Sequence, residues 1–87
     1  MATLKIADTT YDVEYVTVAY EGSLIIRMRD ERRLSEIAPE FENVEHMEYK
    51  NDYVGVDTEY NGYTMLASIF RDTFDTGIIQ ISLKKPE

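Results

Sequence analysis

The residues that come closest to a metal site lie between Asp57 and Gly62. Oxygen-bearing side chains stand at the first, third and fifth positions of this segment, which are Asp57, Glu59 and Asn61, and glycine is the sixth. Calcium-binding loops open in this way, because carboxylate and carbonyl oxygens surround the cation. The twelfth position, however, holds Ser68 where a calcium loop needs a bidentate glutamate. We therefore predict that this segment binds no metal.

The single histidine, His46, offers little further chemistry. It stands beside Glu45 and two residues before Glu48, and adjacent residues of a strand point to opposite faces, so Glu45 and His46 do not readily share a metal ion. Any catalytic triad would depend on the same histidine, and no serine lies in a nucleophile-elbow sequence. Paired carboxylates that hydrolyse glycosides need a substrate-sized cleft, which so small a domain seldom encloses. We expect no catalytic residue, no metal, no cofactor and no enzymatic activity.

Acidic residues are concentrated in the middle of the chain. The formal net charge is -8, and the segment from Glu36 to Glu59 holds eight of the 17 acids against one base, Lys50. A surface of this kind repels nucleic acid and anionic membranes and attracts basic partners. An arginine cluster precedes it, formed by Arg27, Arg29, Arg32 and Arg33. We expect these arginines to pair with nearby acids, and we predict no direct binding of nucleic acid.

Length and composition indicate one small domain spanning residues 1–87. The 87 residues suffice for a single core. The absence of cysteine excludes a disulfide framework and a thiolate nucleophile. The N-terminal residues lack the apolar region of a signal peptide, and no run approaches the ~20 apolar residues of a membrane span. We therefore expect a cytoplasmic protein without membrane contact.

Apolar residues recur at every second position through most of the chain, which is typical of strands. The longest such run extends from residue 11 to residue 20. Its large side chains lie first on one face and then on the other, as Tyr11, Val13 and Tyr15, followed by Val16, Val18 and Tyr20. Because a shift of one residue exchanges the faces of a strand, we predict a bulge or sharp bend near Tyr15 and Val16.

One segment has helical spacing. Its apolar residues are Leu34, Ile37, Ala38 and Phe41, at i, i+3, i+4 and i+7. Asp30 is a suitable N-cap. Proline in a helix interior costs about 3 kcal/mol, and Pro39 lies within the segment. We therefore predict a helix from Glu31 to about Ala38, followed by a separate turn that holds Phe41.

The second half of the chain returns to the strand pattern. Strands are predicted over residues 44–50, 53–60, 63–71 and 77–84. Asn61-Gly62 is the strongest local turn signal, because a type I′ turn needs positive φ at both central residues. We thus predict a hairpin in which Tyr60 and Tyr63 flank this turn. The whole pattern indicates a mainly β (α+β) fold, either a curled antiparallel sheet or a small barrel of six to seven strands with one short helix.

The C-terminal third of the chain, residues 59–85, resembles the ending of small, mostly uncharacterised β-rich proteins of phages and prophages of Gram-positive bacteria. The resemblance lies in Asn61-Gly62-Tyr63-Thr64, in Arg71-Asp72 and in the strand from Gly77 to Lys84. It implies a viral accessory or virion-associated protein with no catalytic residues. It also implies residence in the host cytoplasm or in the virion.

Tyrosine points to an interaction function. The seven tyrosines exceed what one small core can bury, and tyrosine is enriched at protein interfaces. Few lysines and prolines protect the predicted strand edges from pairing. We expect a non-enzymatic structural or protein-interaction module that forms homo-oligomers. The predicted interface residues are Val16, Val18, Tyr20, Tyr60 and Tyr63.

The acidic segment suggests an alternative function. The protein would then be an acidic inhibitor that mimics nucleic acid and occupies the basic groove of a host nucleic-acid-handling or defence protein. The carboxylates that would replace phosphates are Glu40, Glu42, Glu45 and Glu48. In both interpretations the partner is a protein. Salt dependence distinguishes them, because charge pairing weakens in salt whereas an apolar interface persists.

Overall fold

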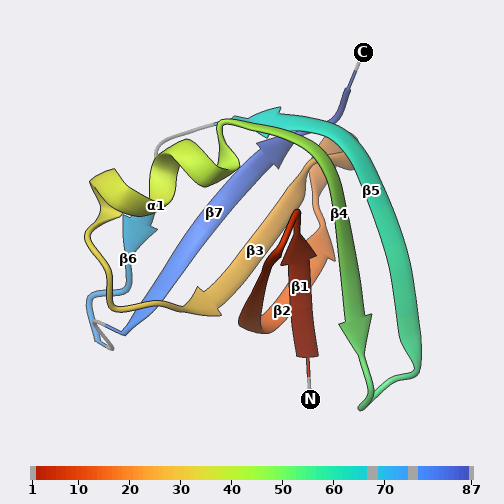
Figure 1. The fold of residues 1–87 in the computed structure, drawn as a ribbon, viewed down its shortest axis with the longest axis horizontal. Coiled ribbons are helices and arrows are strands. Elements are labelled where there is room, and N and C mark those ends of the chain that lie inside the picture. The colour runs from red at the N-terminus through yellow and green to blue at the C-terminus, as the bar shows by residue number, and fades with distance from the viewer. Residues whose placement is uncertain (1, 67–68, 75–76, 87) are drawn as a thin grey trace.

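The computed structural model describes residues 2–66, 69–74 and 77–86, and it is mainly β, as predicted (Figure 1). The elements in chain order are β1 (Ala2–Ile6), β2 (Thr9–Val18), the short 3₁₀ turn η1 (Tyr20–Gly22), β3 (Leu24–Arg29), α1 (Leu34–Phe41), β4 (Asn43–Asn51), β5 (Val56–Met65), β6 (Phe70–Arg71) and β7 (Ile78–Lys84).

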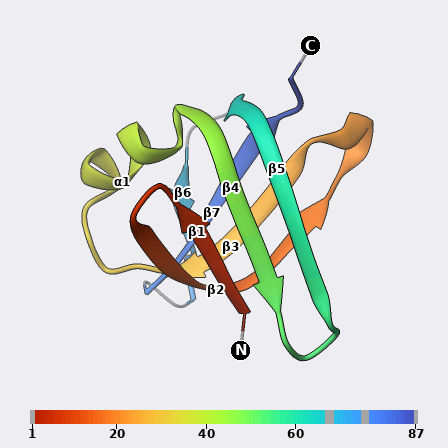
Figure 2. The ribbon, with the colours of Figure 1, turned by 45° about the vertical axis from the view of Figure 1, so that its right-hand side comes forward.

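Six of the strands form a closed antiparallel barrel. Their order is β3-β2-β1-β4-β5-β7, and β7 pairs with β3 to close the ring. Because β3 occupies one side of β7, both β5 and β6 lie on the other side, where Met65 pairs with Leu83 and Phe70 with Gln80. In Figure 2, β4 and β5 cross in front of β3 and β7. The predicted small barrel with one short helix is confirmed.

The core fills the barrel with residues taken at alternate positions of its strands. The largest side chains that are almost wholly buried are Leu4, Leu24, Ile26, Met28, Ile37, Phe41, Val44, Met47, Ile79, Ile81 and Leu83. The helix supplies Ile37 and Phe41 to this set, so α1 covers one end of the barrel (Figure 1). In contrast, β5 contributes only partly buried residues, among them Val56 and Tyr60.

The predicted irregularity in the long second strand is present. Val13 pairs with Met28 and Tyr15 with Arg27, so the register shifts by one residue at Glu14. Before this bulge β2 pairs with β1, and after it β2 pairs with β3. The bend therefore carries the strand from one wall of the barrel to the next, which is a common use of bulges.

The predicted helix boundaries are wrong, although its buried face is confirmed. The helix begins at Leu34 and ends at Phe41, and Pro39 lies inside it. Asp30 is not the N-cap, because its N–H donates to Gly77 O and thus extends the ladder between β3 and β7. The Arg71 guanidinium donates to the carbonyls of Asp30 and Arg32, which also holds this segment outside the helix.

The proline is tolerated because it lies on the outer side of the helix. Pro39 removes the N–H that would reach the Ser35 carbonyl, and both residues are exposed, so water can satisfy that carbonyl. The N-terminus is held by Glu36, whose carboxylate accepts from the Arg33 N–H at 3.3 Å. Phe41 consequently belongs to the last helical turn and not to a separate turn.

The predicted Asn61-Gly62 hairpin is also wrong. β5 runs without interruption from Val56 to Met65, and the chain reverses instead at residues 52–55, where Gly55 has φ 68°. Gly62 does adopt a positive φ of 77°, but inside the strand. The inward-facing side changes there, from Tyr60 before the glycine to Tyr63 after it. Gly62 thus bends a barrel strand, which is the other structural use of a strand glycine.

The single helix of the described residues is short. Its eight residues are too few to cross a bilayer, and no other stretch of the described chain forms a helix of the necessary length and apolarity.

Candidate functional site

The structure separates the residues that suggested metal chemistry. Asp57 and Glu59 lie exposed on one face of β5, and Ser68 is outside the described residues. Within the described part of the chain, no three histidine or acidic side chains are grouped so that they could hold a metal ion. His46 Nδ1 lies 2.6 Å from Asn61 Oδ1 and so joins β4 to β5 on the exposed side. That the protein binds no metal ion in solution remains a prediction.

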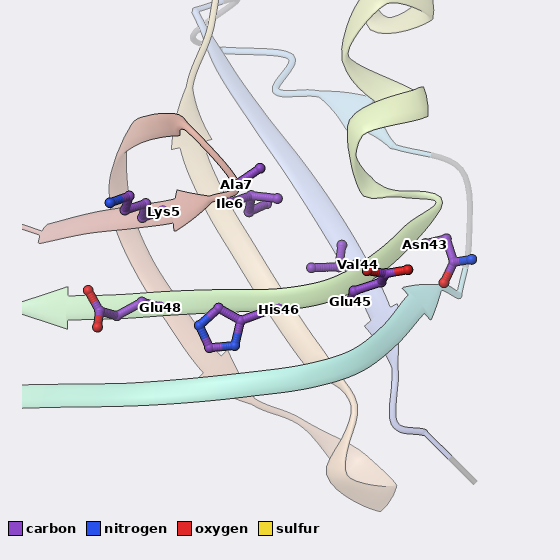
Figure 3. Close-up of a pocket in the computed structure, with 8 residues that line it drawn as sticks. All are labelled: Lys5, Ile6, Ala7, Asn43, Val44, Glu45, His46 and Glu48. Carbon is purple, nitrogen blue, oxygen red and sulfur yellow. The ribbon is translucent and has the colours of Figure 1, made fainter.

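A groove opens where β4 extends beyond β1. Ile6 is the last residue of β1 and pairs with Met47, whereas β4 begins at Asn43. Residues 43–46 therefore have no strand partner on the β1 side within the described chain. The groove has a volume of about 540 Å³, and its lining is formed by Lys5, Ile6, Ala7, Asn43, Val44, Glu45, His46 and Glu48 (Figure 3). Its lining carries both signs of charge, from Lys5 and from Glu45 and Glu48.

Two acidic residues lie opposite one another on the outer face of β4 and β5. Glu48 lies directly opposite Glu59, and like charges opposite one another destabilise a sheet. Glu48 also has bases nearby. Lys5 of β1 lies opposite it in the sheet, and Lys50 Nζ lies 3.5 Å from Glu48 Oε1. Glu59 has no ion-pair partner among the described residues. Asp57 lies opposite Lys50, so the negative charge without a nearby base on the β5 side of this face is that of Glu59.

Two strand edges of the barrel are open. Beyond Val13, β2 pairs with β3 but no longer with β1. The second open edge belongs to β5, which pairs with β7 only through Thr64 and Met65. Within the described chain, the residues of β5 before Thr64 therefore have a strand partner on the β4 side alone. Open edges present unpaired N–H and C=O groups to other strands.

The predicted interface residues occupy different environments. Val16 is 9% exposed and belongs to the core, whereas Val18 is 63% exposed at the end of β2. Tyr60 and Tyr63 are partly buried and pack edge to face, with ring centroids 5.7 Å apart. The side chain of Tyr20 lies outside the described part of the structure. Among the members whose side chains the structure describes, only Val18 is a mostly exposed apolar side chain on an open edge.

The predicted acidic residues are likewise dispersed. Glu42 and Glu45 are exposed, and Glu48 lies between the lysines described above. Glu40 is occupied inside the molecule, because its carboxylate binds the Tyr11 hydroxyl and the Arg32 guanidinium. The structure therefore brings Glu45 and Glu48 to one face but places Glu40 in an internal contact.

The contact of Glu40 with Tyr11 and Arg32 belongs to a polar network that the sequence did not predict. Arg32 Nη1 lies 2.9 Å from Glu40 Oε2, and Arg32 Nη2 lies 2.8 Å from Asp30 Oδ2. The hydrogen bonds from Arg32 hold the pKa of Asp30 below its usual value. Burial, followed by the hydrogen bond to Glu40, raises the pKa of Tyr11 to about 12. No periodic signal links Tyr11 to a residue 29 positions later, so only the folded chain identifies the pair.

Arginines of the cluster that precedes the acidic segment form ion pairs within the molecule. Arg27 binds Glu14 at 3.1 Å and Asp72 at 2.7 Å, so it joins β2, β3 and the segment after β6. Arg32 is bound to Asp30 and Glu40, so both Arg27 and Arg32 are paired with acids as expected.

Comparison with protein-family models, with curated proteins and with solved structures finds no match to this chain. The function is therefore inferred from the geometry and charge of the barrel.

Proposed function

We propose that this protein is a non-enzymatic protein-interaction module that associates with a second copy of itself through the outer edge of β2. The supporting observation is that, within the described chain, β2 beyond Val13 pairs with β3 alone. Two such edges, set antiparallel, would join two barrels through backbone hydrogen bonds in an isologous dimer.

The side chains at this edge support self-association. Val18 is 63% exposed and Tyr15 39% exposed, and burial of a valine side chain stabilises by about 1.5–3 kcal/mol. The one acid within this part of β2, Glu14, is already paired with Arg27 at 3.1 Å. The edge is thus close to neutral, although each copy carries a formal charge of -8. Salt screens the repulsion between the two copies, so association should strengthen with salt.

The resemblance of residues 59–85 to phage and prophage proteins supports a virion-associated or accessory setting. A small barrel that pairs with copies of itself suits that setting, because assembly of identical subunits needs only one self-complementary surface.

Light scattering tests the proposal across the micromolar range at low and moderate salt. We expect a dimer whose population rises with salt. Val18→Lys should give a monomer with an unchanged circular dichroism spectrum. Val54→Lys is the matched control, because Val54 is 68% exposed and lies in the turn between β4 and β5, not on β2. It should leave the dimer intact. A wild-type mass of about 10 kDa at every concentration and salt would refute self-association.

A second candidate, the nucleic-acid mimic, is favoured by the opposed pair Glu48 and Glu59. Like charges placed opposite one another cost stability, and binding to a basic groove would offset this cost by neutralising both carboxylates. A mimic's partner should be lost steeply as salt rises, which is the reverse of the salt response expected for self-association. Retention of a captured partner in high salt would exclude mimicry.

A further inference from the structure

The open edge of β5 has a defined length. β5 is paired with β4 from Val56 to Thr64. On its other side it meets β7 only at Thr64 and Met65. The chain after β7 continues along β5 as far as Gly62, where a methyl group built on the glycine would lie 3.3 Å from Pro86 Cβ. Proline has no N–H with which to extend a ladder. The edge that remains open in the described structure thus runs from Val56 to Asn61.

Two printed hydrogen bonds establish which backbone groups face this edge. Met65 N donates to Glu42 O on the β4 side, and Leu66 N donates to Ser82 O on the β7 side. Antiparallel strands direct successive residues alternately to their two neighbours. The inner face of β5 changes at Gly62, from Tyr60 before it to Tyr63 after it, so this alternation shifts by one residue there. Met65 is an inner residue whose N–H faces β4, and the inner residues Val56, Thr58 and Tyr60 therefore face β4 as well. The N–H and C=O groups of Asp57, Glu59 and Asn61 consequently point to the open side.

The side chains along the edge also alternate. Val56, Thr58 and Tyr60 are partly buried on the inner face, while Asp57 and Glu59 are exposed on the outer face. A strand added here would place its own alternate side chains beside these two rows. Its inner-row residues would meet apolar and aromatic surface. Its outer-row residues would meet carboxylates, of which Glu59 has no ion-pair partner in the described chain.

Charge decides between the possible occupants. If the β5 strand of a second copy were added here, its Asp57 and Glu59 would lie beside Asp57 and Glu59 of the first copy. Like charges across a strand pair are unfavourable. An extended segment with lysine or arginine at alternate positions would neutralise them. The net charge of -8 attracts such a segment at long range as well.

We infer that the β5 edge from Val56 to Asn61 binds an extended segment of another protein in which basic and apolar residues alternate. The segment adds to the barrel as a strand in line with β7, its apolar side chains over Val56 and Tyr60 and its basic side chains beside Asp57 and Glu59. This inference goes beyond the proposed self-association, because it concerns a different edge and a different partner.

Fluorescence anisotropy with labelled peptides of about seven residues tests this mode of strand addition. The probe peptide alternates lysine and valine. A second peptide has the same composition with the lysines and valines in separate blocks, and a third is the alternating peptide N-methylated at every second backbone nitrogen. We expect the alternating peptide to bind, and the other two to bind at least about fivefold more weakly. Equal binding of the alternating and block peptides would show attraction by net charge alone and would overturn the inference.

Matched variants locate the site. Glu59→Lys should weaken binding of the alternating peptide about fivefold or more. Glu45→Lys makes the same charge change on the neighbouring strand, beside the groove of β4, and should weaken binding less than about twofold. Equal losses in the two variants, or a loss confined to Glu45→Lys, would refute the β5 site.

Two further measurements separate this site from the β2 edge and from unfolding. Glu59→Lys should not lower the melting temperature, because it replaces the opposed Glu48–Glu59 pair with opposite charges. The variant should also keep the mass of the wild type in light scattering. Val18→Lys should bind the alternating peptide normally, whatever its oligomeric state, and a loss of binding there would place the peptide on β2 and contradict the inference.

Discussion

The hydroxyl of Tyr11 on β2 donates a hydrogen bond to Glu40 Oε1 on α1 and so fastens the helix to the barrel. The Tyr11 ring packs against Phe41 of the same helix, with centroids 5.4 Å apart. Arg32 binds the same carboxylate from the segment that leads into the helix. One residue of β2 therefore contacts α1 through both a polar and an apolar interaction.

Tyr11→Phe isolates the polar interaction, because phenylalanine keeps the ring against Phe41. We expect the free energy of unfolding to fall by about 1–2 kcal/mol, the usual effect of removing one partner of a buried hydrogen bond to a charged group. Urea denaturation measures this change. Tyr15→Phe is the control, because Tyr15 is an exposed tyrosine of the same strand, and it should change stability by less than about 0.5 kcal/mol. Equal effects in the two variants would show that the contact with Glu40 contributes nothing.

The same residue predicts a pH dependence at alkaline pH. The pKa of Tyr11 is raised in the folded protein from 10.0 to about 12. Between these values the unfolded chain loses the phenolic proton and the folded chain keeps it, so stability falls as pH rises through this range. Denaturation at several pH values should show the fall, and Tyr11→Phe should make it smaller. A pH profile identical in the variant and the wild type would contradict the assignment.

Removal of Phe41 tests whether the helix is part of the core. Phe41→Ala deletes a wholly buried ring, and such changes cost about 3–5 kcal/mol. Phe70→Ala is the matched control, because Phe70 is half exposed on β6, and its cost should be much smaller. Thermal unfolding followed by circular dichroism measures both. A small effect at Phe41 would mean that α1 is detached from the barrel in solution.

The strands and the core could be predicted because both depend on local alternation. In β3 the apolar residues Leu24, Ile26 and Met28 stand at alternate positions of the sequence, and all three are wholly buried. The phase change in the second strand likewise predicted a bulge or sharp bend near Tyr15 and Val16, since a shift of faces within one strand needs an extra residue. The register shifts next to these residues, at Glu14.

The errors arose where contacts between distant residues override a local signal. Arg71 holds the carbonyls of Asp30 and Arg32, and this displaces the start of the helix from the best capping residue. Asn61-Gly62 has the composition of a tight turn, but in the fold Gly62 supplies a bend that faces Pro86. The position and length of the open edges were unpredictable for a related reason, because the length over which two strands pair depends on the stagger of the whole barrel.

Two glycines with positive φ, Gly55 just before β5 and Gly62 within it, give a paired test of that bend. Gly55→Ala and Gly62→Ala both force alanine into a left-handed conformation, which costs about 1–2 kcal/mol. At Gly55 the added methyl group meets nothing within 4 Å, whereas at Gly62 it approaches Pro86 Cβ to 3.3 Å. We therefore expect Gly62→Ala to lower the free energy of unfolding more than Gly55→Ala does. The reverse order would show that the bend at Gly62 is not held against the C-terminal segment.

The opposed carboxylates of Glu48 and Glu59 predict that the protein can be stabilised by removing one charge. Glu59→Gln keeps the size and the outward position of the side chain but ends the repulsion across the strand pair. We expect a gain of about 0.2–1 kcal/mol at low ionic strength, and this gain should shrink in high salt because exposed charges are screened. Glu31→Gln is the control, since Glu31 is exposed outside the sheet and has no strand residue opposite it. Urea denaturation of both variants at low and high salt measures the difference, and an equal gain from Glu31→Gln would attribute the effect to net charge instead of to the Glu48–Glu59 pair.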